Sequence, residues 1–471
     1  MVKYNLRKDK YNYINAFWQK SDSNEIINVY NPSDGSVLGE IINSTYTDVD
    51  LAIKAAKDAL IGWERSSKEY RINYLEKFLK EYEKRIKEIG FIISLELGYP
   101  LKDVEKDQAD MINQILTNLH ILKEFEFENK NKNHTKIYEP YGVCGLITPW
   151  NYPIYTILRK LIFALGAGCT VILKPAELTP FSALIIAEII DEIKLPKGVF
   201  NLINGYGKDC GNYLSQHKDI DLISFTGSIE VGKKIITNSA NSIKKVILEL
   251  GGKSPLILCN DMDFKNIPKI AKNFLLNTSQ VCTVKSRIYV DQRIYSRVVK
   301  QFKKEFNKSI LDKFNKNPTI GPLISQLQKN KVTDFIKSAE KEGAKVWQSS
   351  VNVPTDGYFV RPTIITNLNN KMRVVQKEIF GPVLCIIPFK TIDEALEFAN
   401  DSEYGLSASV QTNDLVLAKS ISRNLQAGTI TINNSHTNRN NPKMGFKQSG
   451  LGYENGLEGL LEYLKIKVIY W

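Results

Sequence analysis

Short β-rich segments alternate with helical segments through most of this chain of 471 residues. One series of strands is predicted at residues 142–148, 170–173, 199–203, 221–225 and 245–249, and a second at 255–258, 286–290, 382–387, 407–410 and 428–432. Strands that are apolar throughout and separated by helices are typical of parallel sheets covered by helices on both faces. The pattern therefore predicts an α/β fold with two doubly wound α/β domains and a cleft between them.

The two ends of the chain do not follow this alternation of strands and helices. The first third is predicted to be mostly helical, with helices at residues 47–60, 68–97 and 103–126. Residues 463–471 alternate polar and apolar side chains and predict a strand. Because an unpaired apolar strand promotes aggregation, we expect this last strand to pair with another segment.

Composition limits the classes of protein to consider. With 43% hydrophobic and 24% charged residues, the chain has the make-up of a globular protein, and its length suits two or three domains. The net charge of +12 is scattered rather than gathered in a basic stripe with aromatic residues, so we expect no nucleic-acid partner. The longest apolar runs are too short to span a bilayer, so we expect no membrane partner.

Cysteine usage gives a further expectation. The six cysteines are widely spaced and include no CxxC pair, which argues against a disulfide framework and against a zinc site. No apolar segment of the kind found in a signal peptide follows the first residues. We therefore expect a protein of a reducing compartment, the cytoplasm, without a metal site.

One glycine-containing segment nearly matches a nucleotide-binding motif. Residues 227–234 follow a predicted strand and fit the P-loop pattern GxxxxGK[ST] except at Lys234, which replaces the hydroxyl that would hold magnesium. An ATPase is therefore disfavoured. A strand followed by Gly227, Ser228 and a helix still offers free N–H groups to an anion such as a dinucleotide pyrophosphate.

Three side chains far apart in the sequence could together support covalent catalysis. Cys282 could act as a thiolate nucleophile, Glu249 could activate water, and the Asn151 amide could hydrogen-bond an oxyanion. Taken singly, each has a structural interpretation: a buried inert cysteine, a carboxylate at a strand end, and an asparagine in a turn. The surrounding motifs decide between these interpretations.

Several separated motifs, in the same order, closely resemble those of the aldehyde dehydrogenase superfamily over nearly the whole chain. They are Pro149-Trp150-Asn151-Tyr152-Pro153, Lys174-Pro175-Ala176-Glu177, Phe225-Thr226-Gly227-Ser228, Glu249-Leu250-Gly251-Gly252, Gln280-Val281-Cys282, Glu378-Ile379-Phe380-Gly381-Pro382 and Gly445-Phe446-Lys447-Gln448-Ser449-Gly450. The resemblance implies a Rossmann-like NAD-binding domain (residues 1–119 and 141–250, with a return of 443–462) and a catalytic domain (251–442). It also implies a β oligomerisation extension (120–140 and 463–471), and hence a homodimer or homotetramer.

The resemblance implies NAD-dependent oxidation of an aldehyde to the carboxylic acid. Cys282 would form a thiohemiacetal and then a thioester, with the oxyanion held by Asn151, and Glu249 would be the general base for hydrolysis. Branches of the family that pass the acyl group to coenzyme A generally lack a glutamate at the matching position. Glu249 therefore favours the hydrolytic branch.

The same resemblance implies which residues bind the cofactor. Lys174 and Glu177 would lie at the adenosine ribose, and Trp150, Gly227 and Ser228 at the pyrophosphate. Glu378 would bind the nicotinamide ribose, with Phe380 beside it. Because the Glu177 carboxylate would accept hydrogen bonds from ribose hydroxyls but repel a 2′-phosphate, we expect NAD to be preferred over NADP. The alternative for Lys174 and Glu177 is a surface ion pair of little energetic value.

The aldehyde path is implied to include Tyr155, Arg159, Val281 and Thr283. Some semialdehyde-oxidising relatives carry arginine at the position of Arg159, where it can hold a carboxylate. The alternative is that Arg159 makes a structural ion pair or faces solvent. The identity of the aldehyde is left open.

Three residues depart from the family pattern. Ser279 and Met444 stand where glycine is common, and Lys285 is unusual near the nucleophile. Lys285 could either lower the pKa of the thiol or face outward. These departures bear on rate and substrate range more than on reaction type.

Two other functions fit parts of the pattern. The first is a thioester or ester hydrolase that acts through Cys282 and Glu249 without turnover of NAD. The second is a non-catalytic dinucleotide-binding oligomeric scaffold, which the intact set of Asn151, Glu249 and Cys282 disfavours.

Overall fold

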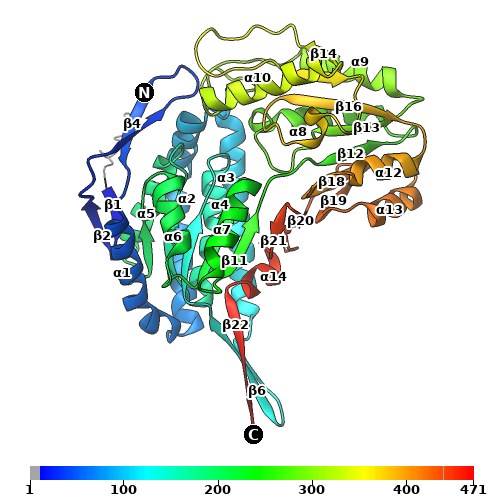
Figure 1. Ribbon diagram of the computed structural model, residues 1–471. Helices are drawn as coiled ribbons and strands as arrows, with labels where there is room; N and C mark the ends of the chain where they lie inside the picture. The colour runs from blue at the N-terminus through cyan, green and yellow to red at the C-terminus, as the bar shows by residue number, and fades with distance from the viewer. Residues whose placement is uncertain (1–10, 439) are drawn as a thin grey trace.

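Residues 11–438 and 440–471 are described by a computed structural model, in which two large sheets form two adjoining lobes (Figure 1). The strand order of the first sheet is β2-β1-β9-β8-β7-β10-β11-β21. Strands β9, β8, β7, β10 and β11 are parallel, whereas β1, β2 and β21 pair antiparallel. The bounds are β1 Tyr11–Ile14, β2 Phe17–Lys20, β7 Val143–Ile147, β8 Thr170–Lys174, β9 Phe200–Leu202, β10 Leu222–Thr226, β11 Lys245–Glu249 and β21 Gly450–Leu451.

Helices cover both faces of this sheet. The bounds are α1 Tyr46–Glu64, α2 Lys68–Leu97, α3 Leu101–Glu124, α4 Pro153–Ala167, α5 Phe181–Glu192, a π-helix Gly207–Gly211, α6 Asn212–Gln216 and α7 Ile229–Ala240. In β7, Cys144 and Leu146 pack with residues of α2, α3, α4 and α5, whereas Val143 and Ile147 pack with α1, α6 and α7. Burial on both faces explains why these strands are apolar throughout.

The second sheet has the order β14-β15-β16-β13-β12-β18-β19, and only β14 pairs antiparallel. Its strands are β12 Pro255–Leu258, β13 Arg287–Asp291, β14 Lys345–Gln348, β15 Thr363–Thr366, β16 Val383–Phe389, β18 Ser407–Gln411 and β19 Thr429–Ile432. Its helices are α8 Ile267–Leu275, α9 Tyr295–Phe306, α10 Gln326–Lys341, α11 Arg373–Gln376, α12 Ile392–Asn400 and α13 Leu415–Asn424, with 3₁₀ turns at Phe264–Asn266 and Leu276–Ser279. The predicted fold class, two doubly wound α/β units, is confirmed.

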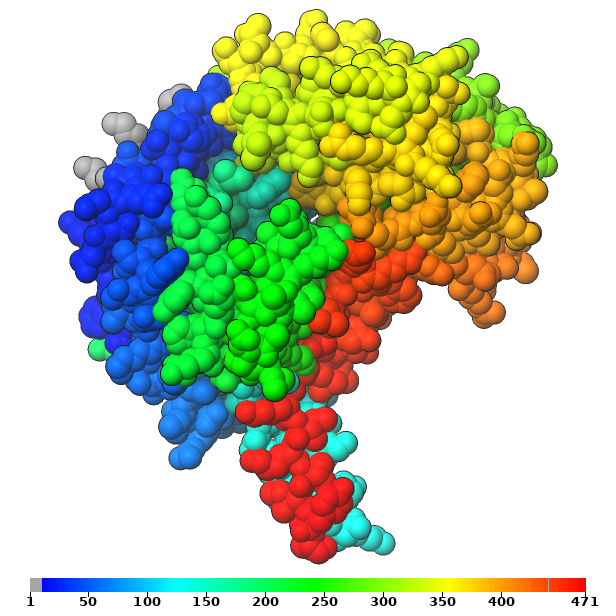
Figure 2. All heavy atoms as spheres, viewed as in Figure 1, coloured from blue at the N-terminus to red at the C-terminus, as the bar shows by residue number. Residues whose placement is uncertain are grey.

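A three-stranded arm projects away from both lobes (Figures 1 and 2). It contains β5 Glu128–Lys130, β6 His134–Pro140 and β22 Leu464–Tyr470, in the order β22-β6-β5. Strand β22 pairs antiparallel with β6 over seven residues, so the last strand finds a partner within its own chain. The remaining elements are the hairpin β3 Ile26–Tyr30 with β4 Val37–Ile42, the pair β17 Tyr404–Gly405 with β20 Phe446–Lys447, and α14 Gly456–Leu461.

The prediction for the first third was wrong in part, because β1 to β4 lie there in addition to the helices. Strands β1 and β2 are joined by Asn15 and Ala16, which both have positive φ, and Ile14 pairs with Phe17. A two-residue turn of this kind defines a hairpin. Helix α3 also extends to Glu124, so the first residues of the predicted extension 120–140 are helical. Residues 1–10 of the predicted NAD-binding domain lie outside the described residues.

Within the described ranges, no helix is long and apolar enough to cross a membrane.

Candidate active site

The first sheet brings polar residues together at the carboxyl ends of its parallel strands. Glu249 is the last residue of β11 and Lys174 the last of β8, while Asn151 lies in the turn between β7 and α4. Along the chain the strands spread outward from β7, with β8 on one side and β10 on the other. Crevices outside the carboxyl ends of strands at such a point are the usual ligand sites of open α/β sheets.

The second sheet faces this edge with the amino ends of its strands. Cys282 lies in the loop before β13, and Glu378 lies before β16. The rings of Trp150, from the first lobe, and Phe380, from the second, meet edge to face with centroids 5.3 Å apart. Figure 2 shows a recess between the two lobes on the face that it presents.

The loop that carries Cys282 has an unusual backbone. Asn277, Thr278 and Ser279 have φ values of 46°, 55° and 60°, in the left-handed region that favours glycine. The Ser279 hydroxyl donates to the Phe274 carbonyl at 2.6 Å, and the Thr278 hydroxyl donates to the Gly321 carbonyl at 2.9 Å. Such residues cost about 1–3 kcal/mol each and persist where surrounding contacts hold them. Ser279 therefore adopts a left-handed backbone conformation that favours glycine, the residue that is common at this position in the family.

Two amide hydrogen bonds join this loop to the turn that holds Asn151. Asn151 Nδ2 donates to the Gln280 carbonyl at 2.8 Å, and Asn277 Nδ2 donates to the Asn151 carbonyl at 2.9 Å. The Gln280 side chain in turn accepts from the Ile324 N–H at 2.9 Å. Because an asparagine amide has two N–H bonds, one donor of Asn151 is left for another acceptor.

Cys282 differs from the other cysteines. All six lie within the described residues and are free; five are buried, and Cys282 is partly exposed. Burial raises the pKa of the Cys282 thiol, the Lys443 ammonium acts in the opposite direction, and Glu249 and Glu378 add to the rise. A cation near this sulfur favours the thiolate, the reactive form.

Glu249 is a buried carboxylate with few partners. It is 2% exposed, and neither carboxylate oxygen has a hydrogen-bond partner in the described part of the chain. The Lys443 ammonium lies 3.3 Å from Oε2 as an ion pair. Burial raises the pKa of Glu249; Lys443 opposes this and Glu454 adds to it. A carboxyl group with a raised pKa is suited to exchange a proton with water.

Lys443 belongs to a charged cluster that the sequence interpretation did not include. Glu454 forms an ion pair with Lys160 and a second one with Arg159, whose Nη1 lies 3.4 Å from the carboxylate. The backbones of Lys443 and Glu454 exchange hydrogen bonds in both directions, at 2.6 and 2.8 Å. The available signal was a lysine just after Pro442, two residues before the motif that begins at Gly445.

Arg159 forms an ion pair with Glu454, which is one of the structural alternatives considered for it. Its guanidinium also donates from Nε to Asn455 Oδ1 at 2.9 Å and lies 4.9 Å from the Tyr155 ring centroid. Nη2 is buried and has no hydrogen-bond partner among the described residues. Val281 and Thr283 flank the nucleophile and are partly exposed.

The other two departures from the family pattern, Lys285 and Met444, are partly buried. Lys285 faces inward, and its ammonium donates to the Thr283 carbonyl at 3.0 Å and the Ser407 hydroxyl at 2.6 Å. Burial lowers the pKa of Lys285 to about 8. A β-carbon on Gly428 would lie 1.9 Å from the Met444 carbonyl oxygen, so the Met444 backbone packs tightly against this glycine.

The predicted adenosine residues form a pair at 3.0 Å, with Lys174 buried and Glu177 partly exposed. They lie at the end of β8, on the other side of β7 from Glu249. Gly227 donates its N–H to the Glu249 carbonyl at 3.1 Å, and the Ser228 hydroxyl caps α7 by accepting from the Val231 N–H.

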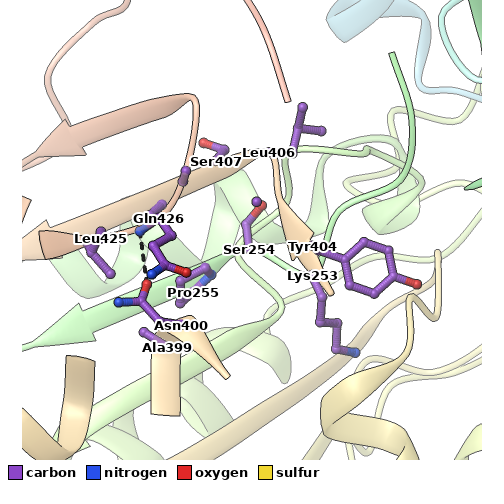
Figure 3. Close-up of a pocket in the computed structure, with 13 residues that line it drawn as sticks. Lys253, Ser254, Pro255, Ala399, Asn400, Tyr404, Leu406, Ser407, Leu425 and Gln426 are labelled. Carbon is purple, nitrogen blue, oxygen red and sulfur yellow. Dashed lines mark hydrogen bonds between the residues drawn. The ribbon is translucent and has the colours of Figure 1, made fainter. Parts of the chain in front are cut away.

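Glu378 reaches back to the first lobe. Its Oε1 accepts from the Gly252 N–H at 2.9 Å, and a β-carbon on Gly251 would lie 2.5 Å from Oε2. Figure 3 shows a small pocket with Lys253 and Tyr404 at one end and, at the other, Asn400, which accepts a hydrogen bond from the Gln426 backbone N–H. In the described residues, no group of three or more His, Cys, Asp or Glu side chains is arranged to hold a metal.

The comparisons with known proteins agree with this geometry. Residues 18–469 match the model of the aldehyde dehydrogenase family. A putative aldehyde dehydrogenase of Staphylococcus aureus (strain USA300) is 40% identical over 463 residues, which is 97% of this chain and 98% of that protein.

Solved structures give the same result. An aldehyde dehydrogenase from Bartonella henselae has a TM-score of 0.96 and 38% identity, covering 98% of this chain and 99% of its own. A cysteine-to-alanine mutant of aldehyde dehydrogenase C from Pseudomonas syringae, in complex with NAD⁺ and octanal, has a TM-score of 0.96 and 35% identity over 98% and 97% of the two chains. A match over nearly the full length in sequence and structure leaves one assignment: the chain belongs to the aldehyde dehydrogenase family.

Proposed function

We propose that this protein is an NAD-dependent aldehyde dehydrogenase that oxidises an aldehyde to the carboxylic acid through a thioester on Cys282. The observation that carries the proposal is the meeting of Cys282, Glu249 and Asn151 where the two lobes face each other. Asn151 hydrogen-bonds the residue two positions before the nucleophile, and Glu249 acts electrostatically on the thiol.

The Cys282 thiolate attacks the aldehyde carbon and forms a tetrahedral thiohemiacetal. The remaining N–H of the Asn151 amide and the Cys282 backbone N–H hold its oxyanion. Removing one such donor typically costs roughly 2.7–4 kcal/mol of barrier. When bound, NAD would supply the hydride acceptor, and loss of hydride from this carbon would re-form the carbonyl as the Cys282 thioester.

Glu249 completes the reaction. It takes a proton from water as the water oxygen attacks the thioester carbon, and the carbon–sulfur bond breaks to release the acid and the Cys282 thiolate. The carboxylate oxygens suit this role because they are buried and keep their hydrogen-bonding capacity.

The residues present fit NAD. Gly207 and Gly211 lie beside the Lys174 side chain without side chains of their own, and the lack of a β-carbon on Gly251 lets Glu378 Oε2 approach its backbone closely. Lys174 and Glu177 would hold the adenosine ribose, and Glu378 the nicotinamide ribose. Trp150, Gly227 and Ser228 would lie at the pyrophosphate, with Phe380 packed against Trp150. NAD complexes of the Pseudomonas syringae enzyme and of a betaine aldehyde dehydrogenase of Staphylococcus aureus (33% identity, TM-score 0.95, over 98% of this chain and 97% of that one) support the assignment.

We propose that the aldehyde reaches Cys282 along Tyr155, Arg159, Val281 and Thr283. The Arg159 guanidinium contacts Glu454 through Nη1 and Asn455 through Nε, while Nη2, which has no hydrogen-bond partner among the described residues, could donate to a carboxylate on the substrate.

We also propose a homodimer or homotetramer in which the arm joins subunits. Strand β22 lies at the edge of its sheet, and Ile466 and Tyr470 are 58% and 73% exposed. We propose the division into domains at residues 119, 141, 250 and 443. The pairing of β21 with β11 supports the return of residues 443–462 to the first domain, whereas the boundary at 119 falls inside α3. Six free cysteines support the cytoplasm as the location.

The test is NADH formation from NAD and a panel of aldehydes, followed by absorbance. We expect turnover by the wild type and none by Cys282→Ala, with Cys210→Ala, at a buried cysteine, as the control that retains it. Ester hydrolysis without NADH formation from any aldehyde would favour the hydrolase, and neither activity would favour a scaffold. Full NADH formation by Cys282→Ala would refute the assignment of the nucleophile.

A further inference from the structure

The Lys443 ammonium forms an ion pair with Glu249 and acts electrostatically on the Cys282 thiol. Its ammonium lies 3.3 Å from Glu249 Oε2. Among the charged groups that act on Cys282, it has the largest influence, ahead of Glu249, Glu378 and Arg159. Lys285 is also near the thiol, but its ammonium is held by Thr283 and Ser407.

The position of Lys443 is fixed by its backbone. Its N–H and carbonyl both pair with Glu454, which is itself held by Arg159 and Lys160. The backbone of Lys443 is therefore held by a buried network, while its ammonium points to Glu249. Such an anchor reduces the conformational entropy lost when the ammonium pairs with an anion.

The charge of the network is unbalanced. Among the ion-paired groups, Arg159, Lys160 and Lys443 contribute three positive charges, whereas Glu249 and Glu454 contribute two negative charges. Lys285 and Glu378, which are also coupled to the thiol, add one charge of each sign and leave the imbalance unchanged. A thiolate at Cys282 would supply the missing negative charge. Cys282, Glu249 and Glu454 raise the pKa of Lys443 against the effects of burial and of Arg159, so this lysine carries its charge at neutral pH.

We propose that Lys443 is a positioning residue whose ammonium is the shared counter-charge of the Cys282 thiolate and the Glu249 carboxylate. The proposal rests on the proposed function, in which these two groups react. Before attack, the ammonium stabilises the thiolate. When the sulfur is acylated and neutral, the ammonium is left to Glu249 and keeps that carboxylate deprotonated for water activation.

The first test follows alkylation of Cys282 by iodoacetamide as a function of pH, without aldehyde or NAD. In Lys443→Met we expect the midpoint to rise by about one pH unit, which lowers the thiolate fraction at pH 7 about tenfold. Lys443→Arg should restore the midpoint because it restores the charge. Lys447→Met, at a lysine four residues further on in β20 whose ammonium donates to the Asn400 and Ser402 carbonyls, should leave the midpoint unchanged. Cys282→Ala defines the background.

A second comparison separates the thiol from the carboxylate. In a Glu249→Gln background, Lys443→Met should still raise the midpoint, since the thiolate loses its cation in either case. In the NADH assay, the acidic limb of kcat should move to higher pH in Lys443→Met, because Glu249 loses the charge that holds it deprotonated.

An unchanged alkylation midpoint in folded Lys443→Met, or a midpoint not restored by arginine, would overturn the proposal. These outcomes concern the thiol alone. Failure of the proposed function would instead appear in the wild type, as absence of NADH formation from any aldehyde.

Discussion

The two sheets contribute to the site in different ways. Glu249 ends a strand that is paired on both sides, with Thr226 and with Gly450, so its backbone is regular and held in place. Cys282 lies three residues after a run of three residues with positive φ, and it is not part of a β-strand. The comparison teaches that a regular strand end positions the acid–base group, while a strained loop carries the nucleophile to it.

The largest effect is expected at the strand end. Glu249→Gln keeps the shape of the side chain but removes the base, and general-base catalysis typically contributes about 10²- to 10⁴-fold. We therefore expect steady-state NADH formation to fall by roughly that factor, while a first turnover still releases about one NADH per site. Stopped-flow absorbance measures both phases. Loss of the first turnover as well would show that Glu249 is needed before the thioester forms, and would weaken the separation of roles between the two sheets.

The next effect concerns the junction between the sheets. Asn151→Ala removes an oxyanion donor and should lower kcat by about 10²- to 10³-fold. Asn277→Ala is the matched control, because it deletes the reciprocal bond to the Asn151 carbonyl without removing a donor to the oxyanion. We expect this control to lower stability by about 0.5–1.5 kcal/mol in urea unfolding and to affect kcat far less. Equal losses of kcat in the two variants would mean that Asn151 acts only by holding the loop.

The smallest effect is expected away from the junction, at Glu177. Glu177→Gln removes the charge that would repel a 2′-phosphate, so the ratio of kcat/KM for NAD to that for NADP should fall several-fold, about 1 kcal/mol. The reaction itself should proceed, because this residue lies at the end of β8 and not beside Cys282. Glu124→Gln, an exposed residue at the end of α3, is the control. A ratio that does not change would remove Glu177 from cofactor choice.

Much of the first lobe follows from local sequence patterns. Asn151 and Glu249 were expected in the site because their side chains suit covalent catalysis and their motifs resemble those of the aldehyde dehydrogenase superfamily. In the structure, both lie at the carboxyl ends of parallel strands, which meet at one edge of the sheet. The hairpin of β1 and β2 was missed because its turn, Asn15 and Ala16, lacks the glycine that usually marks such turns.

The second lobe was harder to predict at its functional edge. The left-handed backbone at Ser279 is held by its contact with Phe274, a packing detail that the sequence does not encode locally. The role of Lys443 was missed because it depends on the contact between Lys443 and Glu249, a residue almost two hundred positions earlier. Ion pairs of this kind arise from tertiary packing and leave no periodic signal.

The return of the chain from the second lobe has a consequence for biosynthesis. Strand β11 is completed on its outer side by β21, which comes after the whole second sheet. While the ribosome makes residues 250 to 449, that side of the strand exposes unpaired N–H and carbonyl groups, a template for association with another nascent chain. The strand that covers this edge and Lys443 both lie within the last thirty residues. A prematurely terminated chain therefore leaves the edge of β11 exposed to aggregation, and its catalytic centre is incomplete.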